Sequence, residues 1–143
     1  MDIDPDRLTE ALAGRLPAVV PDGFDVRSAG GMLWYSNDGL QLTGQLSNYR
    51  VGGAGTDVRA SLAAHGDTAD QGVAGMATPA LGEVQDYVDE ATRDPWPGVR
   101  TPPRAFAAVR DQALHLWYGG QDVTSPVVLA LEPIPLAQIQ RLP

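Results

Sequence analysis

The sequence predicts an α+β domain in which one antiparallel sheet of about five strands carries its helices on one face. Three observations indicate this class. Leucines recur at fourfold spacing near the N-terminus, apolar and polar residues alternate around short turn signals, and a continuous apolar run stands near the C-terminus. The expected element order is α-β-β-(β)-α-α-β-β-β. At 143 residues the chain has the usual size of one domain, so we treat 1–143 as a single domain with one core.

The first part of the chain predicts a helix followed by a hairpin. The helix begins after the capping residue Asp4 and ends at Pro17. Strands are expected over 24–28 and 32–36, because a glycine pair separates two short runs with strand character. A third strand is expected at 40–42, where leucines alternate with polar residues.

The middle of the chain predicts a loop and two helices. Residues 51–56 are rich in glycine and favour a flexible loop. A short helix is expected over 57–64. A longer one starts near 67 or 68, is kinked or restarted at Pro79, and runs to 92, where a proline-rich segment ends it.

The last part of the chain predicts a hairpin and a buried strand. Strands are expected over 104–110 and 113–118, with a turn between them. The run 127–132 is so continuously apolar that we expect a central strand covered on both faces. Pro133 and Pro135 should exclude further ladder pairing at their own positions.

A short pattern occurs twice. Val-Arg at 26–27 is followed after five residues by Leu-Trp-Tyr at 33–35. The same two motifs recur with the same spacing at 109–110 and 116–118. One interpretation is a duplicated helix–hairpin unit in which the two tryptophans are equivalent. The other is convergence, because these residue types all favour strands. Duplication predicts two hairpins that superpose in register.

Composition restricts the partners that the chain can bind. A net charge of −8 repels phosphate backbones and anionic lipid, so nucleic acid and membrane surfaces are not expected, whereas a protein with a basic surface is allowed. The absence of cysteine excludes disulfides and thiolate zinc sites. The acidic start of the chain does not resemble a secretory signal, and no apolar run is long enough to span a membrane. We therefore expect a cytoplasmic protein.

Histidine offers one candidate site. His115 and Trp117 alternate with Leu114, Leu116 and Tyr118, so the two sets should occupy opposite faces of one strand. His115 could then act as a general base. The plainer interpretation, a half-buried strand residue, is favoured. With only two histidines and no carboxylate at metal-ligand spacing from either, we expect no metal site.

Carboxylates on the longer predicted helix form a second candidate. Glu83, Asp86, Asp89 and Glu90 lie on adjacent turns and resemble an acid–base or metal cluster. A metal site of that kind needs a second helix that carries Glu-x-x-His, and the sequence has none. A solvated helix face is the favoured interpretation.

Trp96, between two prolines, is the candidate surface anchor. Held at the periphery, it would suit an interface, and its replacement by alanine should then weaken binding without unfolding the domain. The alternative is that the ring folds back over the end of the helix. The sequence leaves both open.

These observations favour a non-enzymatic protein-binding module of the inhibitor, immunity, chaperone or adaptor type, acting without metal or organic cofactor. The alternative is a small-ligand-binding protein or modest enzyme with a pocket between sheet and helices. A deep pocket that combines His115 with an arginine would favour the alternative, and a flat acidic face the first. The element order is similar to the α-β-β-β-α-β-β-α layout of secretion-chaperone-like domains, a similarity of fold only. The predicted binding residues are Trp96, Asp86, Asp89, Glu90, Arg110, His115 and Trp117.

Overall fold

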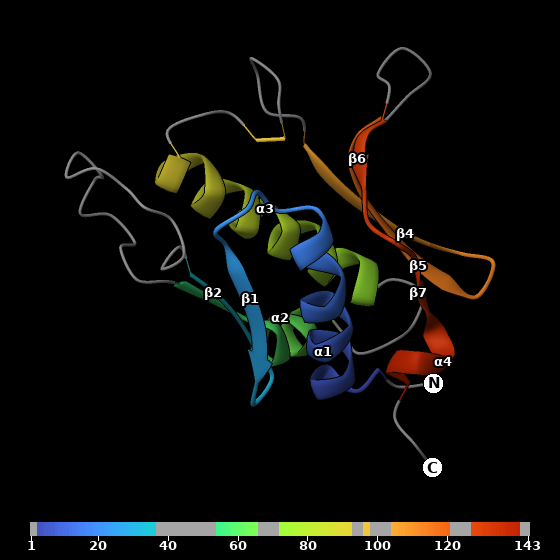
Figure 1. Cartoon of the computed structure of the whole chain (residues 1–143). Coiled ribbons are helices and arrows are strands. Elements are labelled where there is room, and N and C mark those ends of the chain that lie inside the picture. The colour runs from blue at the N-terminus through green and yellow to red at the C-terminus, as the bar shows by residue number, and fades with distance from the viewer. Residues whose placement is uncertain are drawn as a thin grey trace.

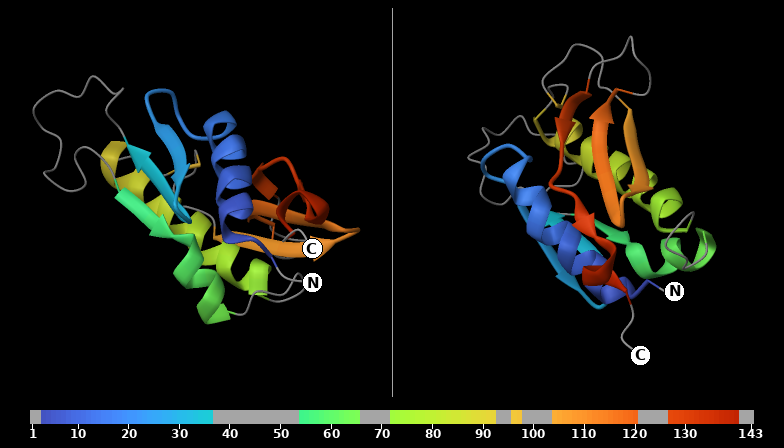
Figure 2. Two further views of the ribbon diagram at one scale, coloured as in Figure 1. Left: turned by 90° about the horizontal axis from the view of Figure 1, so that it is seen from below. Right: turned by 90° about the vertical axis from the view of Figure 1, so that its right-hand side faces the viewer.

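The computed structural model describes residues 3–36, 54–65, 72–92, 96–97, 104–120 and 127–140. Within them the chain forms two antiparallel sheets, one of three strands and one of four. The helices α1 (Pro5–Arg15) and α3 (Gly72–Thr92) lie between the two sheets (Figures 1 and 2). The α+β class is therefore confirmed, but the expectation of a single sheet of about five strands is wrong.

The long helix explains why two sheets form. α3 spans Gly72–Thr92, and its buried residues cover about half of its circumference, which is wider than the stripe of about 100° with which a helix covers one surface. Such a helix can be covered on two sides, by β3 and α2 on one and by β4 and β5 on the other. The helix continues through Pro79, which is exposed, so the predicted restart there does not occur. The buried apolar residues of α3 are Val73, Met76, Ala77, Ala80, Leu81, Val84, Tyr87 and Val88.

The first sheet begins with the predicted hairpin. β1 spans Asp25–Ala29 and β2 spans Met32–Ser36, and a two-residue turn joins them. Gly30 and Gly31 both have positive φ there, 59° and 78°, which glycine adopts without steric cost. α1, Pro5–Arg15, packs against this hairpin as the leucine spacing predicts.

The third strand of the first sheet lies in a segment for which a loop was predicted. β3 spans Ala54–Asp57 and pairs antiparallel with β2, so the predicted flexible loop over 51–56 is wrong from residue 54 onward. The strand predicted at 40–42 lies outside the described residues. Gly55 is a packing requirement here: it is the partner of Trp34, and a Cβ at Gly55 would lie 2.8 Å from the indole ring.

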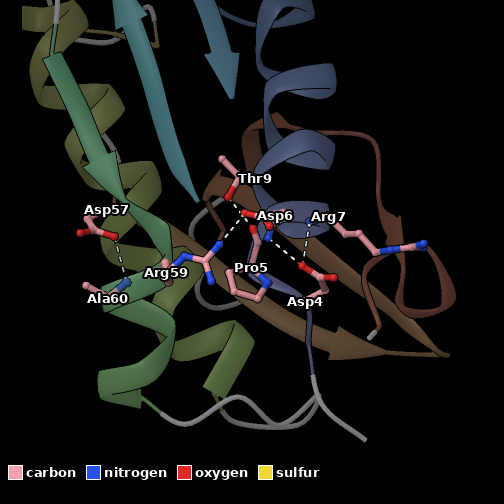
Figure 3. A network of polar contacts seen from close by, with 8 residues as sticks. All are labelled: Asp4, Pro5, Asp6, Arg7, Thr9, Asp57, Arg59 and Ala60. Carbon is pink, nitrogen blue, oxygen red and sulfur yellow. Dashed lines mark hydrogen bonds and ion pairs between the residues drawn. The ribbon is translucent and has the colours of Figure 1, made fainter. Parts of the chain in front are cut away.

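A polar network joins the start of α1 to α2, which spans Val58–His65 (Figure 3). Asp4 caps α1 as predicted, since its carboxylate accepts from the backbone N–H groups of Asp6 and Arg7. Asp6 also pairs with Arg59 of α2 at 2.7 Å. Both partners are more than half exposed, so the pair contributes little to stability.

The second sheet has β5 at its centre. β4 spans Ala105–Arg110 and β5 spans Ala113–Gly119, joined through the predicted turn at 111–112, whose two residues have positive φ. β6, Val127–Ala130, and β7, Ile134–Pro135, both pair with β5. A short helix, α4, follows at Leu136–Ile139.

The apolar run near the C-terminus is not the predicted central strand. Among the described strands, β6 pairs only with β5 and forms an edge. Its first residues, Val127 and Val128, are 54% and 41% exposed. This continuous apolar run therefore begins at an exposed surface and is not buried on both faces. Pro135 also stands opposite Ala113 in a ladder, contrary to expectation, because on an edge strand its missing N–H leaves no partner unsatisfied.

The repeated pattern fails its register test. Val26 pairs with Tyr35 in the first hairpin, whereas Val109 pairs with Leu114 in the second, so the two hairpins do not superpose in register. The two copies do have the same position in their sheets. Each Leu-Trp-Tyr lies on a middle strand, with leucine and tyrosine buried. Among the described helices, none combines the length and the apolarity needed to cross a membrane.

Candidate binding site on the second sheet

Alternation along β5 creates the site. Leu114, Leu116 and Tyr118 are buried, while His115 and Trp117 are only half-buried and face away from the core. The predicted division of this strand into two faces is therefore confirmed. Burying the leucines and the tyrosine against the helices fixes His115 and Trp117 on the outer face of the sheet.

Two residues of β4 hold Trp117 in place. Phe106 stands directly opposite it across the strands, and the two rings stack with centroids 5.9 Å apart and planes 28° apart. The guanidinium carbon of Arg110 lies 5.6 Å from the centre of the indole ring, a cation–π distance. The outer face thus carries a short aromatic and cationic row.

A half-open pocket of about 370 Å³ adjoins this row. It lies where the pairing of β5 with β6 is irregular: the register shifts at Tyr118 and Gly119, and the chain then leaves the ladder near Leu131. Three of its lining residues are polar and the rest are apolar or glycine. The lining residues are Arg110, His115, Leu116, Trp117, Gly120, Val127, Ala130, Leu131 and Pro133.

Two polar atoms in this pocket have no partner. Nε2 of His115 and Nε1 of Trp117 are shielded from solvent, and neither forms a hydrogen bond within the described chain. Leaving a shielded donor or acceptor unpaired costs about 1–3 kcal/mol each, and most such groups in folded proteins find a partner. Because both atoms are inaccessible to solvent, a ligand in the pocket would reach them only after the two side chains shift.

The structure brings together three of the seven predicted binding residues. Arg110, His115 and Trp117 line the same pocket. This pocket opens on the outer face of the sheet, whereas the alternative function was expected to use a pocket between sheet and helices. His115 and Trp117 lie on β5, and the hairpin turn brings Arg110 of β4 beside them. The carboxylates of α3 do not line it, because α3 packs against the opposite face.

Trp96 is not a surface anchor. Its side chain is 8% exposed, and its ring packs edge-on against Tyr118 at 5.1 Å. Its backbone is held by α3: the N–H donates to Asp89 at 2.7 Å, and the carbonyl accepts from Gln85 at 3.0 Å. The interpretation that this ring folds back over the end of the helix is the one that the structure supports.

The carboxylate cluster separates into different roles. Asp86 and Glu90 are exposed, as the solvated-face interpretation predicts. Asp89 instead has a structural role as the acceptor for Trp96. Burial raises the pKa of Asp89, an effect that the hydrogen bond from Trp96 partly offsets and that the neighbouring Asp86 and Glu90 reinforce. The described residues contain no group of three or more acidic or histidine side chains able to hold a metal ion.

Tyr118 closes the core beneath the pocket. Its hydroxyl donates to the carbonyl of Leu81 on α3 at 2.9 Å. Burial raises the pKa of Tyr118 well above its usual range, so the hydroxyl stays protonated and keeps this bond. This hydrogen bond therefore ties β5 to α3 beneath the pocket.

Sequence reasoning missed the walls of the pocket. Val127, Ala130 and Leu131 belong to a run that was predicted to be a buried strand, and Phe106 is not among the predicted binding residues. A signal was present: glycines at 119 and 120, both with positive φ, break the second hairpin just before the run and predict irregular pairing there.

Comparisons with protein-family models, with curated proteins and with solved structures gave no match for this chain. The structure defines its class only as an α+β protein with an open aromatic pocket on one sheet. Its function has to be argued from that site.

Proposed function

We propose that this chain is a non-enzymatic cytoplasmic protein that recognises a protein partner through the outer face of β4–β5–β6, without metal or organic cofactor. One observation carries the proposal. Shielded nitrogen atoms of His115 and Trp117 stand unpaired beside the guanidinium of Arg110 in a pocket that opens on this face. A side chain of the partner that enters the pocket would contact Arg110, and it would reach the two nitrogen atoms once their side chains shift.

The surroundings of the pocket support a protein as the partner. Val127 and Val128 form an exposed apolar rim, and large apolar side chains at a surface gain stability when a partner covers them. β6 also has a free edge among the described strands, to which an extended segment could add by backbone hydrogen bonds. Both features extend the contact beyond the pocket itself.

The charge of the chain supports a basic surface on that partner. A net charge of −8 speeds the encounter with a cationic protein, and dissolved salt weakens the effect. Raising the ionic strength should therefore slow association. An inhibitor, an immunity factor, a chaperone or an adaptor would all fit this description.

A small-ligand-binding protein is the second candidate, and a specific observation favours it. His115 and Arg110 converge on one pocket, whose volume of about 370 Å³ is at the lower end of the 300–1,000 Å³ typical of ligand sites. Such a volume accommodates one side chain or one small molecule.

The test uses crosslinking and a matched pair of variants. A photoreactive residue at Val128 should crosslink a protein partner in the native host, whereas the same residue at Trp34, exposed on the other sheet, should not. The partner is then purified and its affinity measured directly. Val128→Arg should weaken binding at least about tenfold, because it places a charge in the apolar rim. Ala60→Arg, the same charge change at an exposed position of α2, should not.

Equal affinity of wild type and Val128→Arg for the partner would contradict the proposed surface. A partner crosslinked from position 34 and not from 128 would contradict it as well. A bound metabolite, with no protein crosslinked from position 128, would favour the second candidate.

A further inference from the structure

We propose that the pocket on β5 is a carboxylate-binding site. The ligand places its carboxylate on the guanidinium of Arg110, beside Trp117 and His115, and packs an apolar remainder against Val127 and Leu131. The inference rests on the proposed function, because it names the chemistry of the group that enters the same pocket.

The lining requires a ligand that accepts hydrogen bonds. A guanidinium and an indole N–H can only donate, and the imidazole Nε2 of His115 can donate as well. The other lining residues are apolar or glycine, so no lining side chain is a carboxylate, a hydroxyl or an amide. A ligand rich in donors would find one possible acceptor among these side chains, Nε2 of a neutral His115.

A carboxylate fits this donor set better than a phosphate. It is planar and carries one charge, which matches the single planar fork of Arg110. A phosphate carries up to two charges and three or more polar oxygens, which the apolar walls from Val127 to Leu131 would leave unsatisfied. The walls suit an aliphatic or aromatic body attached to the acid.

The donors are also ordered in advance. Arg110 is seated over the Trp117 ring, which Phe106 holds from the neighbouring strand, so binding immobilises little. This preorganisation allows one arginine to hold an anion on a chain of net negative charge.

Two sources can supply this chemistry: a free small carboxylic acid, or a carboxylate of a protein partner, on a side chain or at its C-terminus. The experiment follows the indole N–H signals of the full ¹⁵N-labelled chain by NMR, assigned by Trp→Phe substitution. The ligands are sodium benzoate, benzyl alcohol, inorganic phosphate, and a Phe-terminated dipeptide with a free or an amidated C-terminus.

Benzoate should shift the Trp117 signal saturably, with a dissociation constant on the order of 0.1–1 mM for so small a ligand. Benzyl alcohol, inorganic phosphate and the amidated dipeptide should bind at least about tenfold more weakly than their carboxylate counterparts. Arg110→Leu should weaken benzoate about tenfold or more. Arg27→Leu is the matched control, because Arg27 is an exposed arginine that pairs with Trp34 on the other sheet, and it should leave binding unchanged.

Three results would overturn the inference: no saturable shift at Trp117 with any carboxylate, binding that Arg110→Leu leaves intact, or phosphate binding as tightly as benzoate. The free dipeptide binding more tightly than benzoate supports the inference with a protein as the source, and the reverse supports it with a free acid. If every carboxylate fails while Val128→Arg still weakens a crosslinked partner, the carboxylate chemistry is wrong and the docking surface stands. If benzoate binds while no partner depends on Val128, the carboxylate site stands and the protein-binding function is wrong.

Discussion

Asp89 of α3 forms a hydrogen bond with the backbone of Trp96, and two substitutions separate the contribution of this hydrogen bond from that of the carboxylate charge. In the wild type, Oδ1 of Asp89 accepts from the Trp96 N–H at 2.7 Å in a partly buried setting. Asp89→Ala removes the acceptor and leaves that N–H unpaired, which should lower the free energy of unfolding by about 1–3 kcal/mol. Asp89→Asn keeps an acceptor oxygen in the same place and should lose less.

The dependence on pH tests the charge itself. Burial raises the folded-state pKa of Asp89 above 3.8, the ordinary value for an aspartate. Between these two values the folded state binds more protons than the unfolded state, so stability falls as pH rises through the window. The contribution of this proton is fully present below the unfolded pKa and is lost above the folded one. Asp89→Asn does not titrate, so wild type should lose stability relative to it as pH rises from below 3.8 through the raised pKa.

Urea unfolding followed by tryptophan fluorescence measures all three proteins at a series of pH values. The reasoning is refuted if Asp89→Ala is as stable as Asp89→Asn at neutral pH, because the hydrogen bond to Trp96 would then contribute nothing. A constant difference between wild type and Asp89→Asn across the acidic range would show that the carboxyl is not desolvated.

Two further predictions concern tryptophan packing. Trp96→Ala should lower the free energy of unfolding by about 3–5 kcal/mol, as for other buried aromatic rings, and a clearly smaller loss in urea unfolding would place the ring at the surface after all. Gly55→Ala should cost about 1–3 kcal/mol, because the new Cβ would lie 2.8 Å from the Trp34 ring. The cost should largely disappear in a Trp34→Ala background, and equal costs in both backgrounds would show that the ring does not lie on Gly55.

Local patterns predicted those elements whose partners lie nearby in the sequence. The capped first helix, the turn at 30–31 and the turn at 111–112 are all found, because each depends on the conformational preferences of a few adjacent residues. The two faces of β5 follow from strict alternation. The predicted element order resembles the observed one up to β6, but the third strand was predicted at 40–42, outside the described residues, and β3 is found at Ala54–Asp57.

The errors arose where a residue's role depends on distant segments. Gly55 looks like a flexible residue until Trp34 is placed on the neighbouring strand. Val127 and Val128 look buried, because an apolar run does not reveal whether a second layer covers it. The burial of Trp96 depends on Tyr118, which is distant in sequence, so the sequence left it open. The same holds for the candidate site. Arg110, His115 and Trp117 share one hairpin and were predicted, whereas the pocket walls at Val127, Ala130 and Leu131 lie outside that hairpin and were missed.

The repeated Leu-Trp-Tyr shows how far self-similarity can inform function. In both copies the alternation buries leucine and tyrosine on a middle strand and leaves tryptophan outside the core. The neighbours of the two tryptophans differ. Trp34 stands opposite Gly55 and its ring lies across that strand, whereas Trp117 stands opposite Phe106 and Ala130, beneath the guanidinium of Arg110. The neighbouring strands, and not the repeated residues, therefore determine that the indole nitrogen of Trp117 is shielded and unpaired. A duplicated pattern predicts where a side chain is placed, and the segments around it determine whether that place can bind a ligand.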